Sequence, residues 1–185
     1  MKGEYGKKLF GNTTNFSSQI IKEFNIFVLK PMFIKLTISL SAIFVCFGVY
    51  GFLTNLLYIG IMMSVVSVAV IPAMIIGYKY SLNKSVKANK LCSSNTFVDY
   101  YFEDAGVRSS TRKGDVEIAS LAIDYRMIAK VVEYSHYFYM FITDTQVYIV
   151  DRNGMTEGKS DSLEEFLKTK TKFIKAKNKK QGENK

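Results

Sequence analysis

The side chains that most often carry out nucleophilic chemistry are few in this chain. His136 is the only histidine, and its neighbours, Tyr-Ser before it and Tyr after it, are typical of a turn between two strands. Cys46 lies in a long apolar stretch, where cysteine behaves as a small hydrophobic residue. A Cys–His nucleophile pair requires Cys92 to meet His136, and no local signature supports that pairing. We therefore expect no nucleophilic catalytic centre.

Acidic residues are more frequent, but most of them fall in predicted turns, where they cap the backbone. These acids are Glu103, Asp104, Asp115, Glu117, Asp124, Asp144 and Asp151. A carboxylate pair or a metal site requires several of them to converge, and two cysteines with one histidine are too few for a structural zinc site. No phosphate-binding glycine loop and no hydrolase or metalloprotease motif occurs. The sequence predicts a non-enzymatic protein with no catalytic, metal-binding or cofactor-binding residues and no cofactor.

A long apolar run determines the first of the secondary-structure elements that position these residues. Residues 36–78, a stretch of 43, contain no charged side chain. One helix of this length would measure about 64 Å, twice the roughly 30 Å hydrocarbon core of a bilayer. A glycine and two small polar residues at 51–55 indicate a tight reversal. We therefore predict a transmembrane hairpin over 34–80, with helices at 34–53 and 57–78.

Lysines lie on both sides of this hairpin. Residues 1–35 contain six lysines and two acids, and four more lysines follow the second span. The positive-inside rule then places both termini in the cytoplasm. The four lysines are also candidate contacts for lipid headgroups, unless they only fix the orientation during insertion. They are Lys79, Lys84, Lys87 and Lys90.

The net charge of +9 belongs mostly to the segments beside the membrane and to the tail. Residues 97–161 hold eleven acids and seven bases, so the predicted folded part is acidic. This distribution argues against nucleic acid as a partner and favours the bilayer. Small residues at helical spacing within the hairpin indicate that its two helices pack closely. The alternative is that these residues form a dimerisation face, so a homo-oligomer is also possible on this pattern.

The cytosolic N-terminal segment, 1–33, carries an amphipathic helix. Phe16, Ile20, Phe24 and Phe27 fall on one helical face, and Pro31 is expected to end that helix or to separate it from the first span. The helix lies either in the membrane interface or against the cytosolic domain, and the pattern does not choose between these positions.

From residue 97 the apolar pattern changes to that of strands separated by turn clusters. The predicted strands are 97–102, 107–112, 116–121, 127–134, 137–143 and 146–150. A helix capped near residues 160–162 follows, and both Ile118 and Leu121 are expected in the core. The fold class is thus a membrane helical hairpin plus an α+β domain at 97–176, with one antiparallel sheet of about six strands closed by a C-terminal helix. A basic linker at 81–96 and a basic tail at 177–185 complete the chain.

Four segments of this domain resemble the YcxB-like family of small bacterial two-span membrane proteins. The segments are 102–107, 123–133, 137–142 and 162–167, and the order of parts along the chain agrees as well. The family usually has a basic, proline-containing turn where this chain has Asp-Arg-Asn-Gly at 151–154. The resemblance implies a pleckstrin-homology-like domain at the bacterial cytoplasmic membrane, and it brings no catalytic residues.

One strand offers a candidate surface for a partner. Tyr137, Tyr139 and Phe141 share a face of the predicted strand, and tyrosine is favoured at protein interfaces. The alternative is that these three rings pack under the C-terminal helix or against the N-terminal helix. The sequence therefore favours a membrane-anchored module that binds a protein partner of unknown identity or anionic lipid at the cytoplasmic face. The alternative is an immunity protein that neutralises a membrane-active toxin by direct binding.

Overall fold

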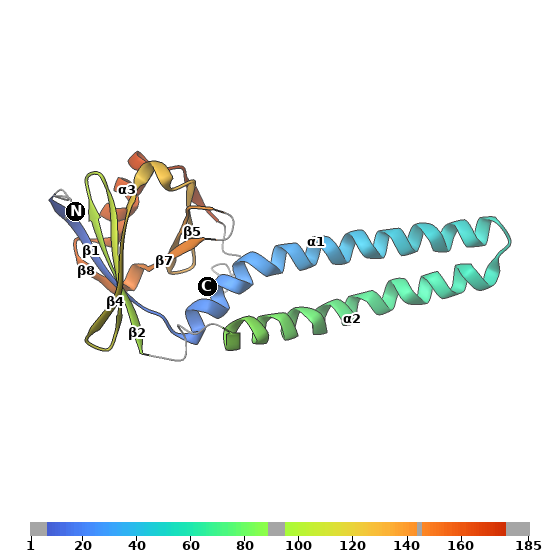
Figure 1. Ribbon diagram of the computed structural model, residues 1–185. Coiled ribbons are helices and arrows are strands. Elements are labelled where there is room, and N and C mark those ends of the chain that lie inside the picture. Colours follow the sequence, from blue (N-terminus) through green and yellow to red (C-terminus); the bar gives the residue numbers. More distant parts are fainter. Residues whose placement is uncertain (1–6, 89–94, 144–145, 177–185) are drawn as a thin grey trace, which may run out of the picture. The chain divides into compact units, whose positions relative to one another are not determined.

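The computed structural model describes residues 7–88, 95–143 and 146–176. The chain divides into two compact units. One unit is a helical hairpin, and the other is a β-rich domain built from residues on both sides of the hairpin in the sequence (Figure 1).

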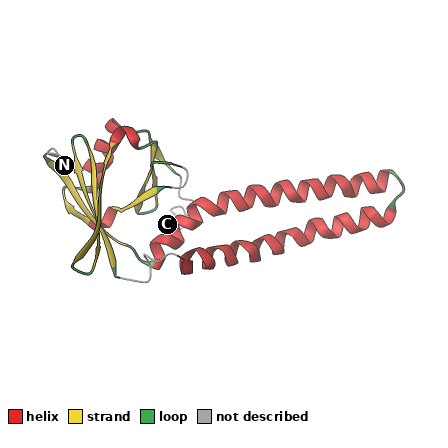
Figure 2. Ribbon diagram, in the orientation of Figure 1, coloured by secondary structure: helices red, strands yellow, loops and turns green. Residues whose placement is uncertain are grey.

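Two long helices form the hairpin, α1 (Ser18–Leu53) and α2 (Leu57–Ala88) (Figure 2). Both are long and apolar enough to cross a membrane. The predicted reversal is confirmed, because α1 ends at Leu53, α2 begins at Leu57, and Asn55 between them has a φ of 60°. Pro31 was expected to interrupt the first helix, but α1 continues through it. An interior proline removes one backbone hydrogen bond and crowds the carbonyl four residues earlier, yet the residues on both sides of Pro31 are helical.

Small residues bring the two helices together, as the sequence predicts. A Cβ atom added to Gly51 would lie 2.7 Å from the backbone nitrogen of Gly60. Farther along the pair, the Ser67 hydroxyl donates to the Ser41 carbonyl at 3.4 Å. Such close backbone approach is the usual basis of helix association within lipid.

The β-rich domain contains two sheets. The first has five strands in the order β4-β3-β2-β1-β8, all antiparallel. Its strands are β1 (Lys8–Asn15), β2 (Thr96–Glu103), β3 (Gly106–Lys113), β4 (Val116–Asp124) and β8 (Met155–Glu157).

The second sheet has four strands in the order β7-β6-β5-β9, with β9 parallel to β5. Two 3₁₀ turns and one helix connect or cover the strands. These elements are β5 (Lys130–Tyr134), β6 (Tyr137–Phe141), β7 (Val147–Asp151), β9 (Phe173–Lys175), η2 (Tyr125–Met127), η3 (Arg152–Gly154) and α3 (Ser160–Lys170).

The expected single sheet of about six strands is therefore replaced by two sheets. The six predicted strands all exist, and β1, β8 and β9 are additional. The strands β8 and β9 have only three residues each, too few to show a period of two. Strand β1 falls in the segment for which the sequence predicted only an amphipathic helix.

Strand β1 makes the hairpin an insertion within the domain. It pairs with β2 from Lys8 opposite Glu103 to Asn15 opposite Phe97, although the whole hairpin separates the two strands in sequence. The Phe16 amide donates to the Thr96 carbonyl at 2.9 Å, so the chain leaves and re-enters the domain at neighbouring points. Figure 1 shows the blue strand β1 within a sheet formed mainly by later residues.

The core lies between the two sheets and α3. Its largest fully buried side chains include Tyr100 and Phe102 from the first sheet, Phe138 from the second, and Leu163 and Leu167 from α3. The prediction for Ile118 and Leu121 is wrong, because they are 60% and 49% exposed. Both lie in the exposed first part of β4, the edge strand of the first sheet, whereas Ile123 near the end of the same strand is buried.

We predict that the domain folds without the hairpin but not without β1. Residues 7–17 joined to 95–176 by a three-residue Gly-Asn-Gly turn should unfold cooperatively on heating, because the linker spans the short gap between Phe16 and Thr96. The fragment 95–176 alone should not, because β2 and β8 each lose their shared neighbour. Thermal unfolding followed by circular dichroism distinguishes the linked chain from the fragment. The control is the same linked chain with residues 8–15 replaced by Gly and Ser. Equal melting of all three proteins would contradict the role of β1.

Candidate functional site

The aromatic residues that were candidates for a partner face are buried. Tyr137, Tyr139 and Phe141 are 7%, 0% and 8% exposed, and the rings of the two tyrosines stack with centroids 6.1 Å apart. Phe138 and Met140, on the opposite face of β6, are buried as well. This burial favours packing within the protein over an exposed partner surface.

The candidate headgroup lysines that the structure describes lie on α2. This helix continues ten residues beyond Tyr78 to Ala88, so Lys79, Lys84 and Lys87 are helical and exposed. Lys90 lies outside the described residues. Lipid contact by these lysines stays a prediction.

His136 and Cys46 are placed as the sequence indicates. His136 is exposed in the turn between β5 and β6, and its carbonyl oxygen accepts the Arg152 amide at 2.8 Å. Cys46 is exposed on α1, and Cys92 lies outside the described residues. Within the described ranges, no three His, Cys, Asp or Glu side chains are grouped so as to hold a metal ion.

The exposed surface of β4 is the feature that sequence reasoning missed. In this strand all residues from Val116 to Leu121 are exposed, and the apolar Val116, Ile118 and Leu121 are 68%, 60% and 49% exposed. Strand β4 is the end of the first sheet, and no described strand pairs with its outer edge. An edge strand of nine residues presents backbone donors and acceptors for a further strand.

The charged side chains of β4 are both acidic, Glu117 and Asp124. Glu117 accepts a hydrogen bond from the Ser110 hydroxyl at 2.9 Å, while Asp124 caps η2 by accepting from the Arg126 amide. In the neighbouring strands, Arg108 and Arg112 form ion pairs with Glu103 and Asp99 of β2. The free edge of the sheet is thus apolar with acidic side chains.

Arg152 organises a cluster of charged side chains at the 3₁₀ turn η3. Its guanidinium binds the Glu133 carboxylate, donates to the Ser160 hydroxyl at 2.9 Å, and donates to Asp161 at 2.8 Å. It also lies over the Phe138 ring, 5.2 Å from the centroid. The Ser160 hydroxyl therefore accepts a hydrogen bond from Arg152 and does not cap α3. The N-cap of α3 is Lys159, and its side chain makes no capping hydrogen bond.

Glu164 extends this cluster to β9. Its carboxylate accepts from Lys168 at 2.6 Å and from Lys175 at 2.7 Å, and it lies 3.6 Å from Arg152. The three basic and three acidic side chains of the Arg152 cluster balance one another. The cluster therefore joins η3, β5, β9 and α3 and offers no net charge to a ligand.

Two buried carboxylates in this domain have lowered pKa values. Burial alone would raise the pKa of Glu164, but hydrogen bonds from Lys168 and Lys175 outweigh it and hold the pKa below its usual value. The same balance holds for Asp99 in the first sheet. Burial raises its pKa, but hydrogen bonds from Arg112 and Thr13 outweigh burial and hold the pKa below its usual value. Both groups stabilise the fold as carboxylates.

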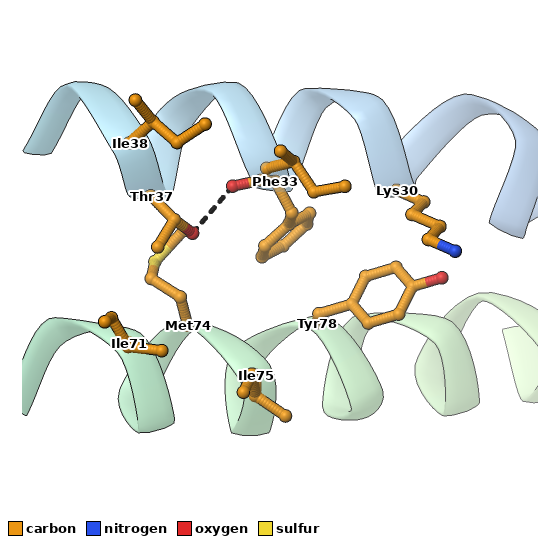
Figure 3. Close-up of a pocket in the computed structure, with 9 residues that line it drawn as sticks. Lys30, Phe33, Thr37, Ile38, Ile71, Met74, Ile75 and Tyr78 are labelled. Carbon is orange, nitrogen blue, oxygen red and sulfur yellow. Dashed lines mark hydrogen bonds between the residues drawn. The ribbon is translucent and has the colours of Figure 1, made fainter.

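A groove lies between α1 and α2 at the lysine-rich end of the hairpin (Figure 3). Its volume is about 280 Å³, and its walls are almost entirely apolar. The ring of Phe33 meets the ring of Tyr78 edge-on, with centroids 5.5 Å apart. Figure 3 shows the Lys30 amine and the Tyr78 hydroxyl pointing toward the same end of the groove. The lining residues are Lys30, Phe33, Ile34, Thr37, Ile38, Ile71, Met74, Ile75 and Tyr78.

Comparison with protein families confirms the resemblance that the sequence motifs indicate. Residues 102–167 match the model of the family described as YcxB-like protein. The match begins within β2 and ends within α3, so it covers most of both sheets and excludes β1 and the hairpin. No curated protein and no solved structure matches the chain.

We predict that Glu164 contributes to the acid sensitivity of the domain. Because its folded-state pKa is lowered, its stabilising effect is complete above its usual pKa of about 4.3 and is lost as the pH falls through the lowered value. In urea unfolding of the full chain in detergent, Glu164→Gln should cost about 1–3 kcal/mol at pH 7 and should flatten the loss of stability between pH 5 and pH 3.

Glu165→Gln is the matched control, because Glu165 is adjacent, exposed and outside the Arg152 cluster. It should leave both the stability at pH 7 and its acid dependence close to those of the wild type. The acid dependence that remains in Glu164→Gln should come in part from Asp99. Parallel pH profiles for Glu164→Gln and wild type would contradict the assignment.

Proposed function

The chain carries a YcxB-like domain at residues 102–167, and from this premise we propose that it is a non-enzymatic bacterial membrane protein that binds a protein partner. The partner would be held at the cytoplasmic face of the membrane by the β-rich domain. The observation that carries the proposal is the exposed, unpaired edge strand β4.

The pairing of β1 with β2 supports a two-span topology. Residues 8–15 precede the hairpin and residues 96–103 follow it, yet they are neighbours in one sheet. They must therefore lie on the same side of any membrane that the hairpin enters, and the chain must cross that membrane an even number of times. Two helices of sufficient length satisfy this condition.

The lysines of the hairpin support the cytoplasmic side for the domain. Among residues 18–88 there are six lysines and one acid, and all seven lie toward the helix ends away from the turn. Cytoplasmic flanks of membrane helices carry such an excess of lysine. The domain would thus face the cytoplasm together with both chain termini.

The arrangement of the domain supports a pleckstrin-homology-like fold. Two mainly antiparallel sheets enclose a core, and α3 contributes the fully buried Leu163 and Leu167 to it. The short strand β9 after α3 and the insertion of the hairpin after β1 are additions to that plan.

The surface of β4 favours a protein partner over anionic lipid. Three exposed apolar side chains beside an unpaired backbone edge suit an extended segment that adds as a further strand. The acidic Glu117 and Asp124 would be repelled by an anionic bilayer. They favour a partner segment that carries lysine or arginine.

The topology predicts the outcome of a reporter fusion. Alkaline phosphatase joined after Lys185 should be inactive in a bacterial host, because the enzyme needs the oxidising periplasm to form its disulfides. A fusion at Asn55, in the turn between the helices, should be active. High activity after Lys185 would contradict the cytoplasmic placement of the domain.

A photo-crosslinking amino acid on β4 tests the partner surface. Placed at Ile118 of the full chain in its native host, it should give a cross-linked protein, while the same group at Met127 should not. Met127 is the matched control because it is apolar and 59% exposed but lies outside β4. Leu121→Lys should reduce the Ile118 product severalfold, since charge on an edge strand opposes strand addition.

Two outcomes of this experiment would contradict the proposal. Equal products from Ile118 and Met127 would show nonspecific contact. A product with twice the mass of the chain, and no other, would show that β4 pairs with a second copy and not with a different protein.

A further inference from the structure

The groove between α1 and α2 lies at a definite depth if the hairpin spans a bilayer, as proposed above. The charge-free run is bounded by Lys35 on α1 and Lys79 on α2, which mark one surface of the hydrocarbon core. The groove residues on α2 extend from Tyr78 at this boundary to Ile71. Seven residues of helix cover about 10 Å, so the groove reaches from the interface about a third of the way into the hydrocarbon.

The polar atoms of the groove are concentrated at its interfacial end. Thr37 lies deeper, but its hydroxyl donates to the Phe33 carbonyl at 2.7 Å, so its one hydrogen-bond donor is used within α1 and cannot bind an anionic group. Lys30 forms no ion pair within the described part of the chain, and its amine points toward the same end as the Tyr78 hydroxyl. A ligand that fits this distribution has an apolar chain and an anionic group at one end.

We propose that the groove binds one acyl chain of an anionic phospholipid, with the lipid phosphate at Lys30 and Tyr78. The volume of about 280 Å³ suits part of a single chain. The excess of lysines over acids at this end of the hairpin favours an anionic headgroup over a zwitterionic one. The site is separate from β4 and does not depend on the identity of the protein partner.

The absence of tryptophan from the chain allows a direct test. Ile34→Trp places a single fluorophore at the groove, and Ile76→Trp places one at a similar depth on a 69% exposed position that does not line it. Each full-length protein is reconstituted in phosphatidylcholine vesicles that contain a small fraction of phosphatidylglycerol. Bromine on the acyl chains of one lipid or the other reports contact by quenching.

At Ile34→Trp, brominated phosphatidylglycerol should quench about fivefold more effectively than brominated phosphatidylcholine at equal mole fraction, as expected for one lysine near the headgroup. At Ile76→Trp the ratio should be close to one. Adding Lys30→Gln to Ile34→Trp should reduce the ratio to below twofold, while Lys35→Gln, which removes an equal charge outside the groove, should leave it unchanged. Thr37→Phe, which fills the groove and retains Lys30, should also reduce it.

Three results would overturn the proposal: equal ratios at the two tryptophan positions, equal losses with Lys30→Gln and Lys35→Gln, or no loss with Thr37→Phe. The helical content of each variant in vesicles, measured by circular dichroism, ensures that a lost ratio reports the site and not a misfolded hairpin. Failure of the wild type to insert into vesicles would overturn both this proposal and the membrane location. Normal insertion without lipid preference would overturn the lipid site alone.

Discussion

The antiparallel pairing of β1 with β2 is the contact on which both units of this protein depend. Strand β1 lies between β2 and β8, so it supplies hydrogen bonds on both of its edges to the first sheet. The same pairing fixes both ends of the hairpin to neighbouring strands, through Asn15 opposite Phe97 and the amide of Phe16 on Thr96.

Strand β1 is also joined to the second sheet through buried polar groups. The Asn12 amide donates to the Asp151 carbonyl at 2.6 Å, and the Thr14 hydroxyl accepts the Asp151 amide at 3.0 Å. Thr14 in turn donates to Asn12 at 2.9 Å, so these buried side chains satisfy one another. Gly154 approaches so closely that an added Cβ would lie 2.2 Å from the Thr13 carbonyl oxygen. This contact, together with the Arg152 cluster, fixes the turn after β7 against both β1 and α3.

The sequence predicts those features that depend on local pattern. The absence of charge and the small residues of the turn identify the hairpin and both helix ends at the reversal, and period-two patterns identify six strands. Strand β1 is not predictable in this way, because its partner lies beyond the hairpin and its own residues are mostly small and polar. Alternation separates the two faces of β6, but it does not tell whether a face is covered. Likewise Ile118 and Leu121 are apolar residues within a predicted strand, which suits a core, and only the structure shows that they lie on an exposed edge strand. The groove depends on how side chains from two helices meet, which no single-helix pattern describes.

The insertion of the hairpin within the sheet also sets an order of events during synthesis. Strand β1 leaves the ribosome first, but its partner β2 is made only after both helices have been translated. In the proposed two-span topology, the domain closes only after the hairpin has returned the chain to the side on which it started. A chain that inserted just one helix would keep β1 and β2 on opposite sides of the bilayer, and the edges of β2 and β8 would stay open. Because unpaired strand edges expose a chain to aggregation and proteolysis, completion of the sheet acts as a check on correct insertion.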